Sequence, residues 1–216
     1  MCKRIILYIV FLQPFFFQMY GEDKVSINDF SISAGETKTV NIVLESDVVY
    51  AGFQFDLYLP TGIVVNDFTA DKNRIPDKTE LSMTQQADGS YRFLALAMGL
   101  DEIAGTSGDI ICITVTAGED LKSGNLIGYF RNVKLSKKDA KGKKYAEMSF
   151  PITIVKNGDS NSDGILNGID IVDIVNHMMG KPSSTGKFNE MAADTNKDGI
   201  VNAADIVAIV NIIMDK

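Results

Sequence analysis

The chain has 216 residues, of which 45% are hydrophobic and 23% are charged. This is the composition of ordinary globular proteins, so it excludes intrinsically disordered and fibrous chains. The formal net charge is -7, and the acidic residues are concentrated near the C-terminus. Nucleic-acid binding requires clustered lysines and arginines. The charge therefore argues against nucleic acid and indicates cations or proteins as partners.

The first residues have the layout of a secretory signal peptide. Lys3 and Arg4 precede an apolar run over residues 5–17. The alternative, a membrane anchor, needs about 20 consecutive apolar residues, and Gln13 and Pro14 interrupt this run. We therefore expect residues 1–21 to be removed, with no transmembrane span in the mature chain. The protein is then secreted, to the extracellular space, the cell surface or the periplasm of a bacterium.

Short segments of alternating apolar and polar residues follow, from residue 22 to residue 156. Such alternation is typical of antiparallel strands with one buried face. Residues 51–59 show it most clearly, with phenylalanine or leucine at every second position from Phe53 to Leu59. About eight strands with no helix between them predict an all-β domain, an antiparallel β-sandwich, followed by a small α-helical domain at residues 157–216.

Two twelve-residue acidic loops lie in that C-terminal segment. Each carries oxygen-bearing side chains at positions one, three, five, nine and twelve, and a glycine at position six permits the sharp turn. Calcium binds six to eight oxygens, and this spacing curls them around one point, whereas magnesium prefers to keep several waters. The predicted ligands of a first Ca²⁺ are Asp159, Asn161, Asp163, the backbone carbonyl of Ile165, Asn167 and Asp170. Those of a second Ca²⁺ are Asp194, Asn196, Asp198, the carbonyl of Ile200, Asn202 and Asp205.

The residues after the two loops also repeat, which indicates internal duplication. In both copies the apolar residues fall at helical spacing, and this predicts one amphipathic helix after each loop. The expected buried stripe of the first helix is Ile171, Ile174, Val175 and Met178. Only residues 156–158 separate the last predicted strand from the first loop, so we expect the helical domain to lie close against the sandwich.

The duplicated loops, each closed by Asp instead of Glu and followed by a helix, resemble those of the dockerin family over residues 158–216. The resemblance implies a non-catalytic module that attaches its host protein to a cohesin domain, as in cellulosome-type assemblies. It also implies that the two residues before each closing Asp contact the partner, namely Gly168, Ile169, Ala203 and Ala204. In the alternative, Ile169 and Ala204 pack against the sandwich.

The sandwich is similar to cohesins and to the carbohydrate-binding-module superfold in three places, residues 35–37, 52–59 and 108–117. This similarity implies a jelly-roll sandwich. Together the two resemblances imply a secreted, non-catalytic, calcium-binding adaptor for cohesin–dockerin association, linked to extracellular polysaccharide use. Its partner is a protein with a cohesin-like or dockerin-like domain, or the two domains of this chain bind each other.

Two alternative functions have less support in the sequence than the adaptor function. In the first, the sandwich binds a polysaccharide, with Tyr58 and Tyr50 as outward aromatic side chains. In the second, the chain is an enzyme. The single histidine, His177, falls on the helix after the first loop, where a solvated position is the simpler interpretation. A glycosidase requires carboxylates that converge, and the candidates are Asp56, Asp67 and Glu102.

Overall fold

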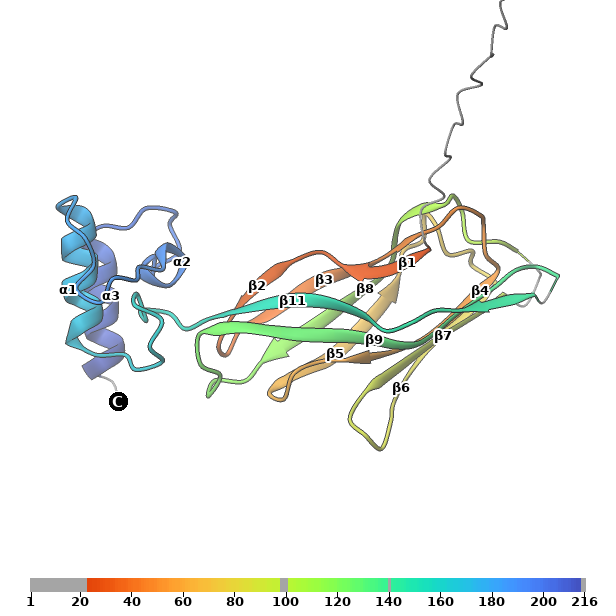
Figure 1. Cartoon of the computed structure of the whole chain (residues 1–216), viewed down its shortest axis with the longest axis horizontal. Coiled ribbons are helices and arrows are strands. Elements are labelled where there is room, and N and C mark those ends of the chain that lie inside the picture. The colour runs from red at the N-terminus through yellow and green to blue at the C-terminus, as the bar shows by residue number, and fades with distance from the viewer. Residues whose placement is uncertain (1–22, 98–100, 140, 215–216) are drawn as a thin grey trace, which may run out of the picture.

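The structure is a computed structural model that describes residues 23–97, 101–139 and 141–214. Within these residues eleven strands precede three helices (Figure 1). This order confirms the predicted sandwich with a small helical region after it. The expected signal peptide, residues 1–21, lies outside the described residues. None of the helices in the described part is long and apolar enough to cross a membrane.

The strands form two sheets. The first has the order β1-β3-β8-β5, from the strands Lys24–Ile27, Thr37–Glu45, Ser107–Ala117 and Ile63–Ala70. The second has the order β2-β11-β9-β4-β7-β6, from the strands Phe30–Ser33, Met148–Val155, Gly124–Ser136, Gly52–Tyr58, Tyr91–Ala97 and Thr79–Gln85. The short β10 (Gly142–Lys144) pairs with β9. All pairs are antiparallel except β2 with β11.

Eleven strands exceed the predicted number of about eight. The strands β1 and β2 have four residues each and β10 has three. Segments this short contain too few alternations for a period of two to be recognised in sequence. The difference therefore lies in the short edge segments and leaves the two-layer architecture unchanged.

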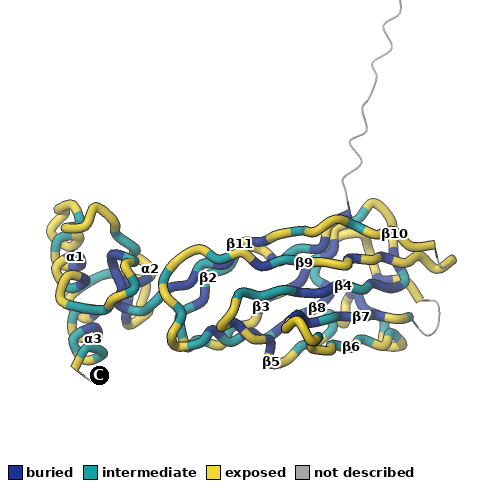
Figure 2. The backbone as a smooth tube through the Cα atoms, turned by 60° about the horizontal axis from the view of Figure 1, so that its bottom comes forward, coloured by how far each residue is buried: buried dark blue, intermediate teal, exposed yellow. Residues whose placement is uncertain are grey.

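The core lies between the two sheets, where the buried residues in Figure 2 are concentrated. Phe55, Phe93 and Phe130 are fully buried. The Phe55 ring centroid lies 5.3 Å from that of Phe93 and 5.2 Å from that of Phe130. Aromatic pairs at these separations contribute about 0.5–1.5 kcal/mol each beyond their buried area. The alternation of residues 51–59 thus identified the centre of the core correctly.

Asp56, on the face of β4 away from Phe55, is only 2% exposed and lies opposite a bulge in β9. The pairing of β4 with β9 shifts register between Gln54 and Asp56, and Asn132 on β9 has a φ of 52°. The Asp56 carboxylate accepts a hydrogen bond from Asn132 Nδ2 at 2.6 Å and forms an ion pair with Arg92 at 2.6 Å. A buried carboxylate needs such partners, because desolvation without them is costly.

Three helices form the C-terminal part: α1 (Gly168–Met178), α2 (Glu190–Ala193) and α3 (Ala203–Met214). They lie beyond the end of the sandwich where β11 leaves it (Figure 1). Their buried core consists of Ile174, Ala193 and Ile209. The buried stripe of α1 is narrower than predicted, because Val175 and Met178 are exposed and only Ile174 is fully buried.

Two contacts join the helical region to the sandwich. Lys197, in the second acidic loop, places its Nζ 3.6 Å from Glu36. Lys156 Nζ donates a hydrogen bond of 3.0 Å to the carbonyl of Gly164, in the first loop. Both acidic loops therefore reach the same end of the sandwich, as the short connection between the two regions led us to expect.

Candidate functional site

The first acidic loop is folded by hydrogen bonds from its own backbone to its carboxylates. Asp159 accepts from the N–H of Asp163 at 3.0 Å and from that of Gly164 at 3.1 Å. Asp170, at the other end of the loop, accepts from the N–H of Asn161 at 3.4 Å and from that of Asn167 at 2.9 Å. These bonds draw the two ends of the loop and its centre toward one point.

The second loop repeats this arrangement bond for bond. Asp194 accepts from the N–H of Asp198 at 3.1 Å and from that of Gly199 at 2.8 Å. Asp205 accepts from the N–H of Asn196 at 3.1 Å and from that of Asn202 at 2.8 Å. The duplication recognised in sequence is thus a duplication of geometry.

Left-handed backbone conformations make the curl of both loops. The glycines at position six, Gly164 and Gly199, have φ values of 83° and 85°. The residues at position four, Ser162 and Lys197, have φ values of 56° and 60°. An L side chain is strained in this region of φ, so glycine at position six lowers the cost of the turn.

Each loop leads directly into a helix. Asn167 caps α1, since its side chain accepts from the N–H of Ile169 at 2.7 Å, and Asp170 completes a capping box. In the second copy, Asn202 accepts from the N–H of Ala204 at 2.7 Å. The residue at position nine therefore starts the helix in both copies, and the helix dipole adds positive potential near the closing carboxylate.

The first loop brings like charges together. Asp170 is fully buried, and burial raises the pKa of its carboxyl. The carboxylates of Asp159 and Asp163 raise this pKa further, against the lowering effect of the N–H groups of Asn167 and Asn161. A bound cation removes this repulsion, so the first loop fits a cation electrostatically.

The chemistry of the donors fits calcium in both loops. The predicted ligands combine carboxylate, amide and backbone carbonyl oxygens, which calcium accepts in a flexible shell. In the described part of the chain, no group of three or more His, Cys, Asp and Glu side chains is close enough to hold a metal by itself. The two ligand sets, which include amide and carbonyl oxygens, remain a prediction.

An apolar stripe runs along the exposed side of each loop and helix. Ile165 is 64% exposed, and its counterpart in the second copy, Ile200, is 65% exposed. The stripes continue in both helices. Stripe 1 consists of Ile165, Ile169, Val172 and Met179, and stripe 2 of the matching residues Ile200, Ala204, Val207 and Met214, all of them exposed. Packing of Ile169 and Ala204 against the sandwich, one of the two alternatives, is therefore wrong.

The four predicted partner residues, Gly168, Ile169, Ala203 and Ala204, all lie at the exposed N-terminal ends of α1 and α3. The other members of the stripes were not predicted as partner residues. The sequence contained a signal for them, because Val172 and Met179 recur as Val207 and Met214. These repeated apolar residues lie outside the buried stripe of each helix.

A buried carboxylate in the first helix has no counterpart in the second. Asp173 of α1 is fully buried, whereas Ala208 occupies the matching position of α3. Burial would raise the pKa of Asp173, but hydrogen bonds from Ser184, Ser183 and Thr185 outweigh it, so the pKa is lowered. These bonds fasten residues 183–185 beside stripe 1, and together with Gly168, Ile169 and Val172 the residues Ser184 and Thr185 line a hollow of about 570 Å³.

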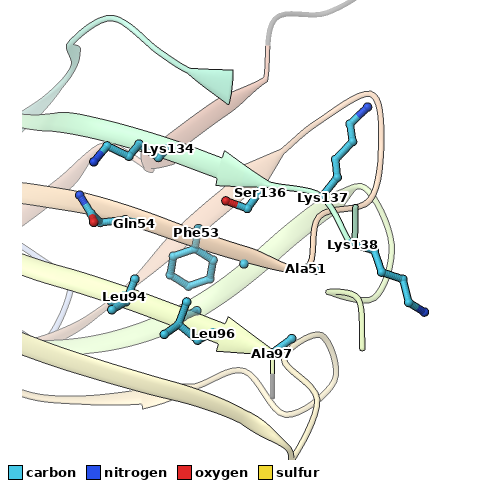
Figure 3. Close-up of a pocket in the computed structure, with 12 residues that line it drawn as sticks. Ala51, Phe53, Gln54, Leu94, Leu96, Ala97, Lys134, Ser136, Lys137 and Lys138 are labelled. Carbon is cyan, nitrogen blue, oxygen red and sulfur yellow. The ribbon is translucent and has the colours of Figure 1, made fainter. Parts of the chain in front are cut away.

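The sandwich has a shallow hollow of about 280 Å³ on the outer surface of β9, β4 and β7 (Figure 3). Leu94 and Leu96 of β7 form one side of it, and Lys134 and Ser136 of β9 form the other. Gln54 of β4 lies between the two sides. Leu96 is 48% exposed. The hollow therefore combines an aliphatic ledge with polar and cationic side chains.

The predicted glycan-binding tyrosines are not free. Tyr50 is buried, and its hydroxyl donates to Asp23 at 2.7 Å, so its predicted outward position is wrong. Tyr58 is half-buried, its hydroxyl donates to Asp88 at 2.7 Å, and the Arg131 guanidinium carbon lies 4.7 Å from its ring centroid. Tyr50 therefore offers no open face to a sugar, and Arg131 covers one face of the Tyr58 ring.

The candidate catalytic residues do not assemble. Asp56 is in the seven-stranded sheet and paired with Arg92, whereas Asp67 is exposed on β5 of the other sheet. Glu102 is exposed in the connection between β7 and β8. His177 is partly exposed, and its ring stacks on Phe188 at a centroid distance of 4.3 Å.

Comparison with known proteins agrees with this two-part description. Residues 157–214 match the family model described as dockerin type I domain. Type I dockerin domains bind calcium, which agrees with the predicted cofactor at the level of the family. No curated protein matches the chain.

The sandwich is similar to cohesin modules of known structure. CaCohA2 from Clostridium acetobutylicum has a TM-score of 0.53 at 15% identity, covering 61% of this chain and 90% of that one. A chain of the Coh-OlpC–Doc435 complex from Clostridium thermocellum has a TM-score of 0.52 at 17% identity, covering 61% and 92%. The cohesin module of a Clostridium perfringens family 33 glycoside hydrolase has a TM-score of 0.51 at 14% identity, covering 62% and 96%. Identities this low show the fold alone. A cohesin fold and a dockerin type I match thus occur in one chain.

Proposed function

We propose that this protein is a secreted, non-catalytic adaptor that associates through calcium-stabilised docking of its helical region on a cohesin-like sandwich. We further propose that the assembly serves extracellular polysaccharide use, as the family resemblance implies. The observation that carries the proposal is the pair of matching apolar stripes, both open to solvent, on a region that matches dockerins. Exposed contiguous apolar surface is typical of protein–protein interaction sites.

The two acidic loops position these stripes. Within each loop the closing Asp is also the third residue of the helix, so the geometry of the site and the direction of the helix are linked. Calcium, when bound, supplies the positive charge that balances the carboxylates of each loop. Asp159 and Asp170 would hold the first ion from the two ends of the loop, and Asp194 and Asp205 the second.

The sandwich offers a matching surface at the hollow of Figure 3. The side chains of the stripes are aliphatic, and Leu94 and Leu96 present an aliphatic ledge of the same chemistry. We propose this ledge as the receiving surface. Its polar border, Gln54 and Ser136, would bond the rim of the partner, as in protein interfaces with an apolar centre and a polar rim.

The helical region of a chain lies too far from the ledge of the same chain to dock on it. Glu36 at the helical end of the sandwich precedes β3, whose nine residues span about 30 Å. Leu96 of the ledge pairs with Gly52, which follows the end of β3 in the chain. The ledge therefore lies near the end of the sandwich opposite to the helices. The connection at residues 156–158 spans at most about 10 Å. We therefore propose that the partner is a second copy of this chain or another cohesin-like sandwich.

Sedimentation velocity of the full chain tests association between copies. With excess calcium we expect the sedimentation coefficient to rise with protein concentration, and with chelator we expect a monomer at all concentrations. The double variant V172D/V207D places a charge in both stripes, and L96D places one on the ledge. Each should reduce the association constant by at least about tenfold, since burying an unpaired charge is costly.

The control is Thr69→Asp, because Thr69 is exposed on β5 in the other sheet. It adds the same charge away from both surfaces and should associate as the parent chain does. A chain that remains monomeric in calcium, or V172D/V207D and L96D variants that associate as the parent does, would contradict the proposal.

A further inference from the structure

Lysines are concentrated in one hairpin of this acidic protein. Six lysines and one aspartate lie within residues 134–144, while the whole chain has a net charge of -7. The hairpin joins the end of β9 to β10, and all six lysines are exposed. Ser136, near the start of the hairpin, pairs with Gly52, the first residue of β4. This end of β4 is the end of the sandwich away from the helices, so the hairpin lies there too.

The strand register places two of these lysines directly opposite each other. Lys144 of β10 pairs with Lys134 of β9. Residues paired in this way point to the same face of the sheet, and like charges in directly opposite positions destabilise the pairing. The hairpin therefore carries an electrostatic cost that a bound anion would remove.

The described residues compensate little of this charge. Lys141 forms an ion pair with Asp139 at 3.2 Å, and Lys143 lies 3.8 Å from Asp23. Within the described part of the chain, Lys134, Lys137, Lys138 and Lys144 form no ion pair. Lys137 and Lys138 line the hollow of Figure 3 together with Lys134, and Lys137 also lines a second hollow of about 660 Å³ beside Tyr50.

A row of side chains crosses four strands at this point. Gln54 of β4 pairs with Leu94 of β7 on one side and with Lys134 of β9 on the other, and Lys144 extends the row on β10. Three gaps between neighbouring strands make the row about 14 Å long. A ligand along it meets an aliphatic surface first, then an amide, then two positive charges.

From this row we infer that the lysine hairpin binds a carboxylate-bearing polysaccharide segment lying across β4, β9 and β10. Carboxylates pair with Lys134 and Lys144, and Lys137 and Lys138 bind the next anionic units of the polymer. The Gln54 amide and the Ser136 hydroxyl, which also border the ledge, provide hydrogen bonds to sugar hydroxyls when no protein partner is docked there, so the two ligands compete. Binding rests on charge, since the open row contains no aromatic ring for stacking.

The geometry favours a glycan over an acidic peptide. Peptides commonly bind sheets by adding a strand to a free edge, where unpaired backbone groups are available. This row instead crosses strands whose backbones are already paired to each other. A membrane surface is disfavoured because such basic and apolar surface elements are typically amphipathic helices, whereas these lysines lie on strands and a hairpin.

Affinity electrophoresis of the full, calcium-loaded chain tests the inference. The gels contain carboxymethyl dextran, dextran sulfate or unmodified dextran, so that the polymer backbone is constant and only the anionic group changes. We expect retardation in carboxymethyl dextran, weakening as salt is added, and none in unmodified dextran. Electrostatic binding to a polyanion falls steeply with salt.

The variant K134Q/K137Q/K138Q/K144Q should bind carboxymethyl dextran at least about tenfold more weakly. Its matched control, K24Q/K72Q/K78Q/K181Q, removes the same charge from exposed lysines elsewhere and should be retarded as the parent chain is. Equal retardation of both variants would overturn the inference. So would retardation in dextran sulfate alone, or binding to phosphatidylglycerol vesicles without binding to carboxymethyl dextran.

Discussion

Asp173 on α1 and Ser184 in the following connection form two hydrogen bonds with each other. The Asp173 carboxylate accepts from the Ser184 backbone N–H at 2.5 Å and from its hydroxyl at 2.6 Å. Ser183 and Thr185 donate to the same carboxylate. This buried group is one feature that distinguishes the first copy of the duplicated loop and helix from the second.

Asp173→Ala should therefore destabilise the helical region, by about 2 kcal/mol, since it removes a buried carboxylate that accepts four hydrogen bonds. The variant copies the residue that the second repeat already has, Ala208. Urea unfolding of the full chain, followed by helix circular dichroism in excess calcium, measures the change. A loss below about 0.5 kcal/mol would contradict the structural role.

The same carboxyl predicts a pH dependence. Its folded pKa is lowered, so it stabilises the fold above the unfolded pKa of about 3.9, and this contribution is lost as pH falls through the folded pKa. We expect the stability difference between the parent chain and Asp173→Ala to shrink progressively below about pH 4. A difference that grows on acidification would be inconsistent with the lowered pKa.

The closing residues of the two loops predict separate calcium sites. Asp170→Asn and Asp205→Asn each neutralise the oxygen ligand at position twelve of one loop, with little change in shape. Isothermal titration calorimetry should count two ions for the parent chain and one for each single variant. At a free concentration 100 times the dissociation constant, each ion stabilises the folded state by about 2.7 kcal/mol. The same stoichiometry in all three proteins would contradict the predicted ligands.

Arg74 predicts a stability effect in the sandwich. It is buried, and its guanidinium donates to the carbonyls of Ala104 at 2.7 Å, of Leu44 at 3.1 Å and of Gly105 at 3.1 Å. Burial lowers its pKa, and the carboxylates of Asp71 and Asp109 offset this effect only in part. Arg74→Lys keeps the charge but cannot reach all of these acceptors.

We expect Arg74→Lys to cost about 2–3 kcal/mol in thermal or urea unfolding, because carbonyls of β3 and of the connection before β8 lose their donor. The control is Arg131→Lys, at an exposed ion pair with Glu147, where the loss should stay within about 1 kcal/mol. Equal effects of the two substitutions would show that Arg74 does not hold the loops together.

Gly128 predicts a packing effect. It pairs with Phe150 across β9 and β11, and a Cβ on Gly128 would overlap the Phe150 ring. Gly128→Ala should destabilise the sandwich by about 1–3 kcal/mol through overpacking. Gly168→Ala is the matched control, since its Cβ meets no atom within 4 Å and the second copy has Ala203 there. It should be neutral or slightly stabilising in unfolding experiments.

Features that depend on near neighbours in the chain could be predicted from the sequence. Alternation over residues 51–59 predicted the buried face of β4, and the spacing of Asp159, Gly164 and Asp170 predicted a loop that the structure folds twice in the same way. Both signals are local, because strand periodicity and loop curvature arise from successive backbone torsions. The prediction of a two-layer β-sandwich followed from the strand periodicity.

The contacts between residues distant in the chain could be identified only from the folded structure. The pairing of Lys134 with Lys144, the pairing of Gln54 with Lys134 and the contact of Glu36 with Lys197 depend on strand register and on where the helices rest. A one-residue change of register moves a side chain to the other face of a sheet. Local periodicity contains no information on register, so the lysine row and the open stripes emerged only when the chain was folded.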